Sequence, residues 1–133
     1  MAELIYIDTN IWIDYFLDRT DYMRPLGEFA YALFSKSLTC KYNIIISNLV
    51  LYELQKKGFE QQAKTLITEF KQRNKVTIIS FSNTEIQNAK KYPHWQDRLH
   101  EILASKGNAT YLVTRNIKDF EGDLVQIKFP EDL

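Results

Sequence analysis

Apolar residues along this chain occur either in short unbroken runs or at helical spacing, and the two patterns alternate. The run at 4–7 precedes apolar positions three and four residues apart over 11–16, which predicts a strand and then a helix. Further runs at 44–46, 76–81, 110–114 and 124–127 are separated by amphipathic segments. We therefore expect an α/β domain, a three-layer α/β/α sandwich whose parallel sheet has four to five strands.

Residues that favour helix ends mark the boundaries between these strands. Pro25 suits the first position of a second helix, and Ser47 can cap the helix after the second strand. An amphipathic helix over 59–74 follows it. The segment Ser82-Asn83-Thr84-Glu85 matches a capping box, and Gly107 closes the last helix before the fourth strand.

Composition limits the possible classes of protein. The 133 residues, 1–133, suit a single domain, and the formal net charge of zero gives no global field that would attract nucleic acid. The lone Cys40 excludes an internal disulfide and fits a reducing compartment. No stretch reaches transmembrane length, and the start lacks the pattern of a signal peptide. We expect a cytoplasmic protein that does not contact a membrane.

The aspartate at the end of the first strand is the first candidate for chemistry. Asp8 follows a buried run and precedes Thr9 and Asn10, whose side chains can bond local backbone. Open α/β sheets bind ligands outside the carboxyl ends of their strands, where Asp8 is expected. A carboxylate is costly to bury there without a partner, and a divalent cation is one such partner. A helix cap or a turn is the alternative interpretation of Asp8.

Three other segments carry polar side chains toward the same edge. Glu53 follows the second strand, Asp97 lies in the first turn of the helix before the fourth strand, and that strand leads into a loop with Asn116 and Asp119. Each, taken singly, is also explained as a solvent-facing residue. Because strand ends and the starts of the following helices share one edge, we expect these side chains to meet near Asp8. Hard oxygen ligands of this kind suit Mg²⁺ or Mn²⁺.

The pattern as a whole resembles the PIN-domain family, whose small nucleases include the toxins of VapBC-type toxin–antitoxin pairs. The matching segments are 6–10, 46–54, 97–104 and 111–120, and their order and spacing fit over nearly the full length. The resemblance implies a parallel sheet with strand order 3-2-1-4-5. It also implies Mg²⁺- or Mn²⁺-dependent cleavage of RNA.

Position by position, the resemblance makes Asp8 and Asp97 the main metal ligands, and Glu53 a ligand through water or an orienter of the attacking water. Many members have an acid where this chain has Asn116, and Asp119 matches a further acid that completes the catalytic and metal-binding set. The missing charge at Asn116 weakens the expectation of a second tightly held ion. Two further groups are expected beside the acids: Thr9, Asn10, Thr114 and Asn116 support them by hydrogen bonds, and Arg115 and Lys118 contact the RNA substrate.

Three alternatives use these residues differently. His94 and His100 lie on either side of Asp97, and they are interpreted as surface or capping residues rather than as zinc ligands. A receiver-type phosphoacceptor also has an acid after its first strand, but 78–82 lacks the acceptor aspartate expected after the third. The third alternative is a degenerate PIN fold that only binds RNA or a partner protein, which Asn116 suggests.

The expected helices carry more large apolar side chains than a small domain readily hides, and leftover patches usually mark interfaces. The set comprises Trp12, Tyr15, Phe16, Phe29, Tyr31, Phe34, Tyr52, Phe59 and Phe70. Toxins of the family that the chain resembles dimerise and are silenced by an antitoxin. We therefore expect a two-fold homodimer with a groove for an amphipathic helix of an antitoxin protein beside Asp8 and Glu53.

Overall fold

Five parallel strands form one sheet in the order β3-β2-β1-β4-β5 in the computed structural model, which describes residues 2–20, 23–39 and 41–133. The strands are β1 (Glu3–Ile7), β2 (Tyr42–Ser47), β3 (Val76–Ile79), β4 (Tyr111–Val113) and β5 (Gln126–Lys128). The order confirms the prediction. In this order β2 and β3 are added on one side of β1, and β4 and β5 on the other. The junction of β1 and β4 is therefore the topological switch point, which is where such sheets bind ligands.

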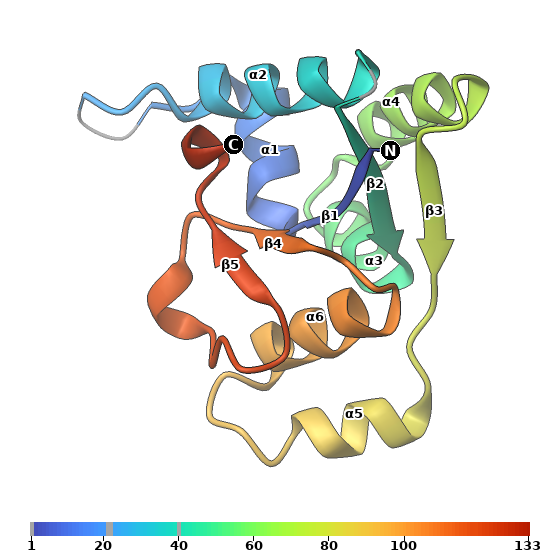
Figure 1. Cartoon of the computed structure of the whole chain (residues 1–133), viewed down its shortest axis with the longest axis vertical. Helices are drawn as coiled ribbons and strands as arrows, with labels where there is room; N and C mark the ends of the chain where they lie inside the picture. Colours follow the sequence, from blue (N-terminus) through green and yellow to red (C-terminus); the bar gives the residue numbers. More distant parts are fainter. Residues whose placement is uncertain (1, 21–22, 40) are drawn as a thin grey trace.

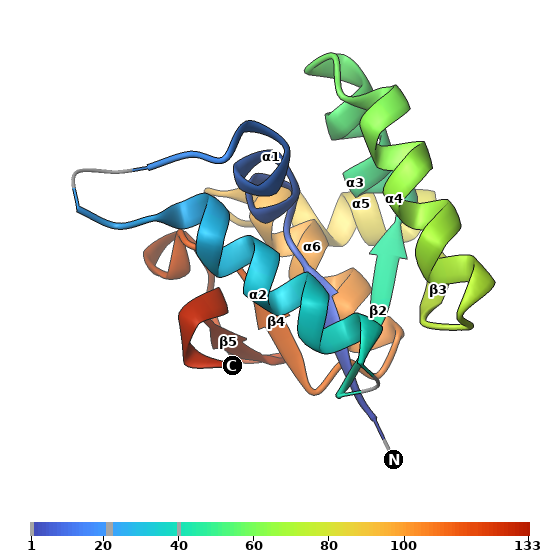
Figure 2. The ribbon, with the colours of Figure 1, turned by 90° about the horizontal axis from the view of Figure 1, so that it is seen from above.

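Helices cover both faces of the sheet, as predicted. They are α1 (Thr9–Leu17), α2 (Leu26–Leu38), α3 (Asn48–Lys56), α4 (Glu60–Gln72), α5 (Asn83–Ala89) and α6 (Trp95–Lys106). Figure 1 shows α1 and α2 on one side of the sheet and α5 and α6 on the other, and Figure 2 shows α2 lying across the strands. The helices α3 and α4 pack against each other beside β2 and β3.

Most differences from the sequence prediction concern the ends of elements. β3 stops at Ile79 because its pairing with β2 ends there, and the Phe81 N–H donates instead to the side chain of Asn48. The prediction also placed Pro25 inside α2, whereas the helix begins one residue later. β4 is shorter than predicted and β5 begins later, and two short 3₁₀ helices, η1 (Ile117–Asp119) and η2 (Pro130–Asp132), were not predicted. Cys40 lies outside the described residues.

The two helix caps predicted at Ser47 and Ser82 are present in the structure. The Ser47 hydroxyl accepts the N–H of Val50 at 3.2 Å and starts α3, and Ser82 and Glu85 form the predicted capping box of α5. These contacts involve residues three positions apart, so they need no tertiary information.

The central strand and one tryptophan fix the position of α1. Ile5, Tyr6 and Ile7 of β1 are fully buried. The indole N–H of Trp12 donates to the carbonyl of Ile7 at 3.1 Å, and its ring packs on Phe34 of α2 at 4.8 Å between centroids. The start of α1 is therefore held against the carboxyl end of β1.

Most of the large aromatic side chains singled out in the sequence are buried or half-buried, but Tyr31 and Tyr52 are exposed. Leu17 and Ile78 are also exposed apolar residues. None of the described helices is both long and apolar enough to cross a membrane.

Gly27, in the first turn of α2, lies against the end of α1. Its N–H donates to the carbonyl of Arg19 at 2.9 Å, and a Cβ at this position would lie 2.5 Å from the Cα of Asp18. Helix propensity alone predicts that Gly27→Ala stabilises the protein by about 0.5–1 kcal/mol. We expect the opposite, a loss of about 2 kcal/mol in the free energy of unfolding, because the two backbone segments must separate.

Urea denaturation measures this difference, with Gly58→Ala as the control. Gly58 has a φ of 87° and open space around it, so an alanine there is strained only in its backbone. A Gly27→Ala protein that is as stable as the wild type would contradict the close approach of α1 and α2.

Candidate metal centre

A polar pocket of about 200 Å³ opens at the carboxyl edge of the sheet, beyond the paired ends of β1 and β4. Asp8 enters it from the end of β1, Glu53 from α3 and Asp97 from the first turn of α6. The lining residues are Asp8, Thr9, Asn10, Ile13, Arg19, Glu53, Lys57, Gln96, Asp97, His100, Arg115 and Asn116. Three acids that are far apart in sequence therefore share one pocket.

Asp8 is both a helix cap and a member of the pocket. Its carboxylate is buried, and Oδ1 accepts the N–H of Thr9 at 2.7 Å at the start of α1. Oδ2 accepts the hydroxyl of Thr114 at 2.9 Å. The Thr114 oxygen in turn accepts the Asn116 N–H at 3.2 Å and lies 3.4 Å from the Asn10 amide nitrogen. The two interpretations of Asp8 left open by the sequence are thus compatible.

Glu53 faces into the pocket rather than toward solvent. The hydroxyl of Thr9 donates to its Oε1 at 2.5 Å, and the same oxygen lies 2.9 Å from Nε2 of His100. Burial raises the pKa of Glu53, but the contacts with His100 and Thr9 outweigh burial and bring the pKa below its ordinary value. The side chain is therefore a carboxylate at neutral pH.

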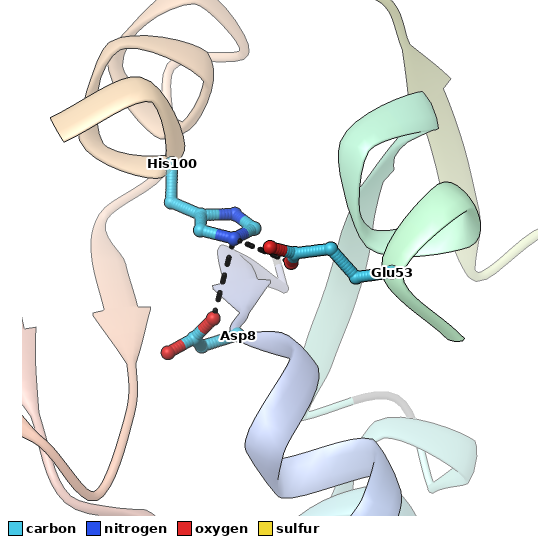
Figure 3. Close-up of side chains that lie close together, drawn as sticks. All are labelled: Asp8, Glu53 and His100. Atoms are coloured by element: carbon cyan, nitrogen blue, oxygen red, sulfur yellow. Dashed lines mark hydrogen bonds and ion pairs between the residues drawn. The ribbon is translucent and has the colours of Figure 1, made fainter. Parts of the chain in front are cut away.

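His100 differs from the expectation of a surface or capping residue, because it is buried between the acids. Figure 3 shows its ring pointing toward both carboxylates, with Nε2 at 2.9 Å from Glu53 and 3.5 Å from Oδ1 of Asp8. Burial lowers the pKa of His100, but the carboxylates of Asp8 and Glu53 outweigh it and raise the pKa above its ordinary value. The sequence did hold one signal, since a residue three positions after Asp97 lies on the same helix face.

The opposite side of the His100 ring is anchored inside the core. Nδ1 lies 2.6 Å from the hydroxyl of Tyr6, and that hydroxyl lies 2.6 Å from Oγ of Ser47. All three residues are buried. Burial raises the pKa of Tyr6 well above its ordinary value, so the phenol stays neutral.

The pKa of Asp97 is raised by its surroundings in the pocket. Burial, together with the charges of Asp8 and Asp119, raises its pKa to about 6, despite the opposing effect of His100. A cation among these carboxylates would relieve the repulsion and lower this pKa.

The other predicted site residues lie around this centre. Asn116 lines the pocket, whereas Lys118 and Asp119 are not among the described residues that line it. Asp119 is partly exposed, and its Oδ1 lies 3.9 Å from Nε2 of His94. Arg115 lines the pocket with its Nε donating to Asp14 at 2.9 Å. The sequence did not single out Arg19 and Lys57, the other cationic residues of the lining.

The donor set fits a divalent cation. Ligand atoms of Asp8, Glu53 and His100 all lie within 4.8 Å of one another, and Asp97 borders the same pocket. The buried Oδ1 of Asn10 accepts no hydrogen bond from the described residues and adds a neutral oxygen beside the acids. Carboxylate, amide and imidazole donors are all ligands of first-row divalent ions, and oxygen donors also suit Mg²⁺.

The raised pKa of Asp97 should lower the stability of the folded protein at neutral pH. Because the pKa is about 6 in the folded protein against an ordinary 3.8, the folded state binds this proton more tightly than the unfolded chain. The carboxyl group therefore lowers stability as the pH rises through this interval, and its full cost is present above about 6. We expect Asp97→Asn to raise the melting temperature at about pH 8 with a chelator present, and the gain to shrink at about pH 5.

Thermal melts of wild type and variant at both pH values test this, and Asp132→Asn, which replaces an exposed acid, is the control. An Asp97→Asn protein that melts below the wild type at both pH values would show that burial and the neighbouring charges do not make this carboxylate destabilising.

Comparisons with known proteins bear on the fold. No protein-family model and no curated protein matches the chain. Among solved structures, a chain in the crystal structure of VapBC2 from Rickettsia felis, bound to a DNA fragment from its promoter, matches with a TM-score of 0.62. The match covers 95% of this chain and 98% of that chain at 21% sequence identity. The protein therefore has the same fold as a chain of a VapBC2 assembly, in agreement with the resemblance to the PIN-domain family.

Proposed function

We propose that this protein is an Mg²⁺- or Mn²⁺-dependent ribonuclease that hydrolyses phosphodiester bonds of RNA, and that it is the toxin of a type II toxin–antitoxin pair. The observation that carries the proposal is the meeting of Asp8, Glu53 and Asp97, from three separate elements, in one pocket beside the junction of β1 and β4. The fold shared with a VapBC2 chain supports the assignment to a toxin–antitoxin pair.

In this proposal Asp8 and Asp97 hold the metal ion directly, and Glu53 acts through a water molecule. The ion, when bound, neutralises charge on the scissile phosphate and makes a bound water more acidic. The hydroxyl of Thr9 holds the Glu53 carboxylate in place to orient the attacking water. The hydroxyl of Thr114 likewise holds the Asp8 carboxylate in place to bind the ion. Asn10 contributes through its contact with Thr114.

The lining of the pocket carries positively charged side chains as well as acids. Arg19, Lys57 and Arg115 line it, and we propose that Arg115 and the exposed Lys118 contact the RNA backbone. Asp119 lies farther out and contributes its negative charge to the site, since that charge already acts on Asp97. Asn116 lines the pocket, where it adds a polar group without a charge.

We propose an antitoxin protein and a second copy of this chain as partners, in the cytoplasm. An apolar groove of about 490 Å³ between α3 and α4 supports docking of an amphipathic antitoxin helix, because it lies beside the helix that carries Glu53. Its apolar lining consists of Leu51, Tyr52, Ala63, Ile67 and Ile78.

Two alternatives were set against this function. A receiver-type phosphoacceptor is excluded by the sheet, since receivers have the strand order 2-1-3-4-5 and this sheet has 3-2-1-4-5. A catalytically weak PIN-fold module that only binds RNA or protein is the second candidate, and the uncharged Asn116 in the pocket favours it. The cleavage experiment below separates it from the nuclease.

Cleavage of RNA should require both the ion and its ligands. We expect Mn²⁺- or Mg²⁺-dependent ribonuclease activity that EDTA abolishes, and near-complete loss in Asp8→Asn and Asp97→Asn because each change removes a charged ligand. Gel analysis of RNA and calorimetric titration with Mn²⁺ measure activity and binding together. Asp132→Asn, at an exposed position, should retain both. Activity that persists in both pocket variants would refute this site, and Mn²⁺ binding without cleavage would favour the binding module.

The oligomeric state is a separate expectation. Exposed Tyr31, Tyr52 and Leu17 are apolar surfaces that a second copy could cover. We expect light scattering to give the mass of a dimer at roughly tens of micromolar, the range in which a modest interface associates. A monomer mass throughout this range would contradict the homodimer and leave the nuclease assignment unaffected.

A further inference from the structure

We propose that His100 is a nitrogen ligand of the divalent ion, so that the site is a mixed nitrogen and oxygen centre that prefers Mn²⁺ and other first-row ions to Mg²⁺. The inference rests on the proposed function, because it concerns the ion of that same pocket. It assigns a role to the one buried histidine among the described residues, which the acidic ligand set does not use.

The ring of His100 points toward the acids of the pocket. Nε2 lies 2.9 Å from Oε1 of Glu53 and 3.5 Å from Oδ1 of Asp8, and the three ligand atoms lie within 4.8 Å of one another (Figure 3). Donors that bind one ion at about 2.1 Å from different directions lie about 3–4 Å apart. Small adjustments would therefore let Nε2 of His100 and Oδ1 of Asp8 bind a single cation, with Glu53 close enough to act on it through a water molecule.

The other nitrogen of the His100 ring is hydrogen-bonded inside the core. Nδ1 lies 2.6 Å from the hydroxyl of Tyr6, which lies 2.6 Å from Oγ of Ser47. Oγ also accepts the N–H of Val50 at 3.2 Å and has a further lone pair for the phenol. If Tyr6 donates to Ser47, its oxygen accepts from Nδ1–H, and the proton on Nε2, which faces the acids, is the one that a metal ion would displace.

Such an arrangement is typical of metal-bound histidines. The nitrogen that does not bind the metal usually donates to a fixed acceptor, which sets both the tautomer and the ring orientation. Here the acceptor is Tyr6, a fully buried residue of β1, so His100 is oriented by the core of the domain. We infer that Tyr6 is a positioning residue for His100.

The ligand type decides the preferred metal. Imidazole suits first-row transition ions, whereas Mg²⁺ prefers oxygen ligands and gives up its water reluctantly. In the alternative role His100 is an internal cation that donates Nε2–H to Glu53 and does not bind the metal ion. The two roles differ in whether nitrogen is bonded to the ion.

Pulsed electron paramagnetic resonance of the Mn²⁺-loaded full-length protein distinguishes them, because ¹⁴N bonded to Mn²⁺ modulates the electron spin echo. We expect this modulation in the wild type and in the control His94→Gln, whose imidazole is exposed and lies beside Asp119. We expect it to be absent in His100→Gln. Titrations should show Mn²⁺ affinity falling roughly tenfold or more in His100→Gln, with Mg²⁺ affinity changed much less.

Tyr6→Phe is the second variant. It keeps the aromatic core and the imidazole but removes the acceptor of Nδ1–H, so the ¹⁴N modulation should remain while Mn²⁺ affinity falls. Unchanged affinity in Tyr6→Phe would overturn the positioning role of Tyr6.

The wild-type spectrum alone tests whether His100 binds the ion, so the experiment remains decisive even if His100→Gln fails to fold. Bound Mn²⁺ without ¹⁴N modulation, or modulation that disappears in His94→Gln, overturns the role of His100 and leaves the proposed function intact. A wild-type protein that binds no Mn²⁺ overturns both.

Discussion

The buried carboxylate of Asp8 imposes the main constraint on this structure. A carboxyl group at 6% exposure needs hydrogen bonds to both oxygens, and the fold supplies them from the first turn of α1 and from Thr114 after β4. The first bond depends on α1 starting immediately after β1. The second depends on β4 pairing beside β1, which also brings the Asp8 N–H to the carbonyl of Val113 at 2.9 Å. Strand order and site are therefore linked through one side chain.

The negative charge around Asp97 is only partly balanced by the chain itself. His100 lies against Asp8 and Glu53, and Arg115 is engaged by Asp14. Asp97 is left among like charges, and its pKa of about 6 reflects burial and this crowding. A domain that kept these acids only for stability would do better to separate them, because unpaired carboxylates lower stability at neutral pH. Their retention together is the physical argument for a cation.

The loop that follows β4 is held in place from α6. The buried carboxylate of Glu101 accepts the N–H groups of Glu121 and Gly122 at 2.7 and 3.0 Å. Arg98, one turn earlier on the same helix, contacts Asp123 of this loop. One helix thus places Asp97 and His100 in the pocket and also fixes the segment that follows Asn116 and Asp119. A change in the core side of α6 would therefore disturb both halves of the site.

The sequence by itself determined the alternation of elements, the caps at Ser47 and Ser82, and the acids that could meet, because these follow from spacing within one segment and from where strands end. Strand order required the family resemblance as well. The tertiary structure decided that His100 enters the pocket and that Asp119 lies outside its lining. The physical reason is that sequence spacing sets the face of a helix, whereas only packing against the sheet sets where that face points.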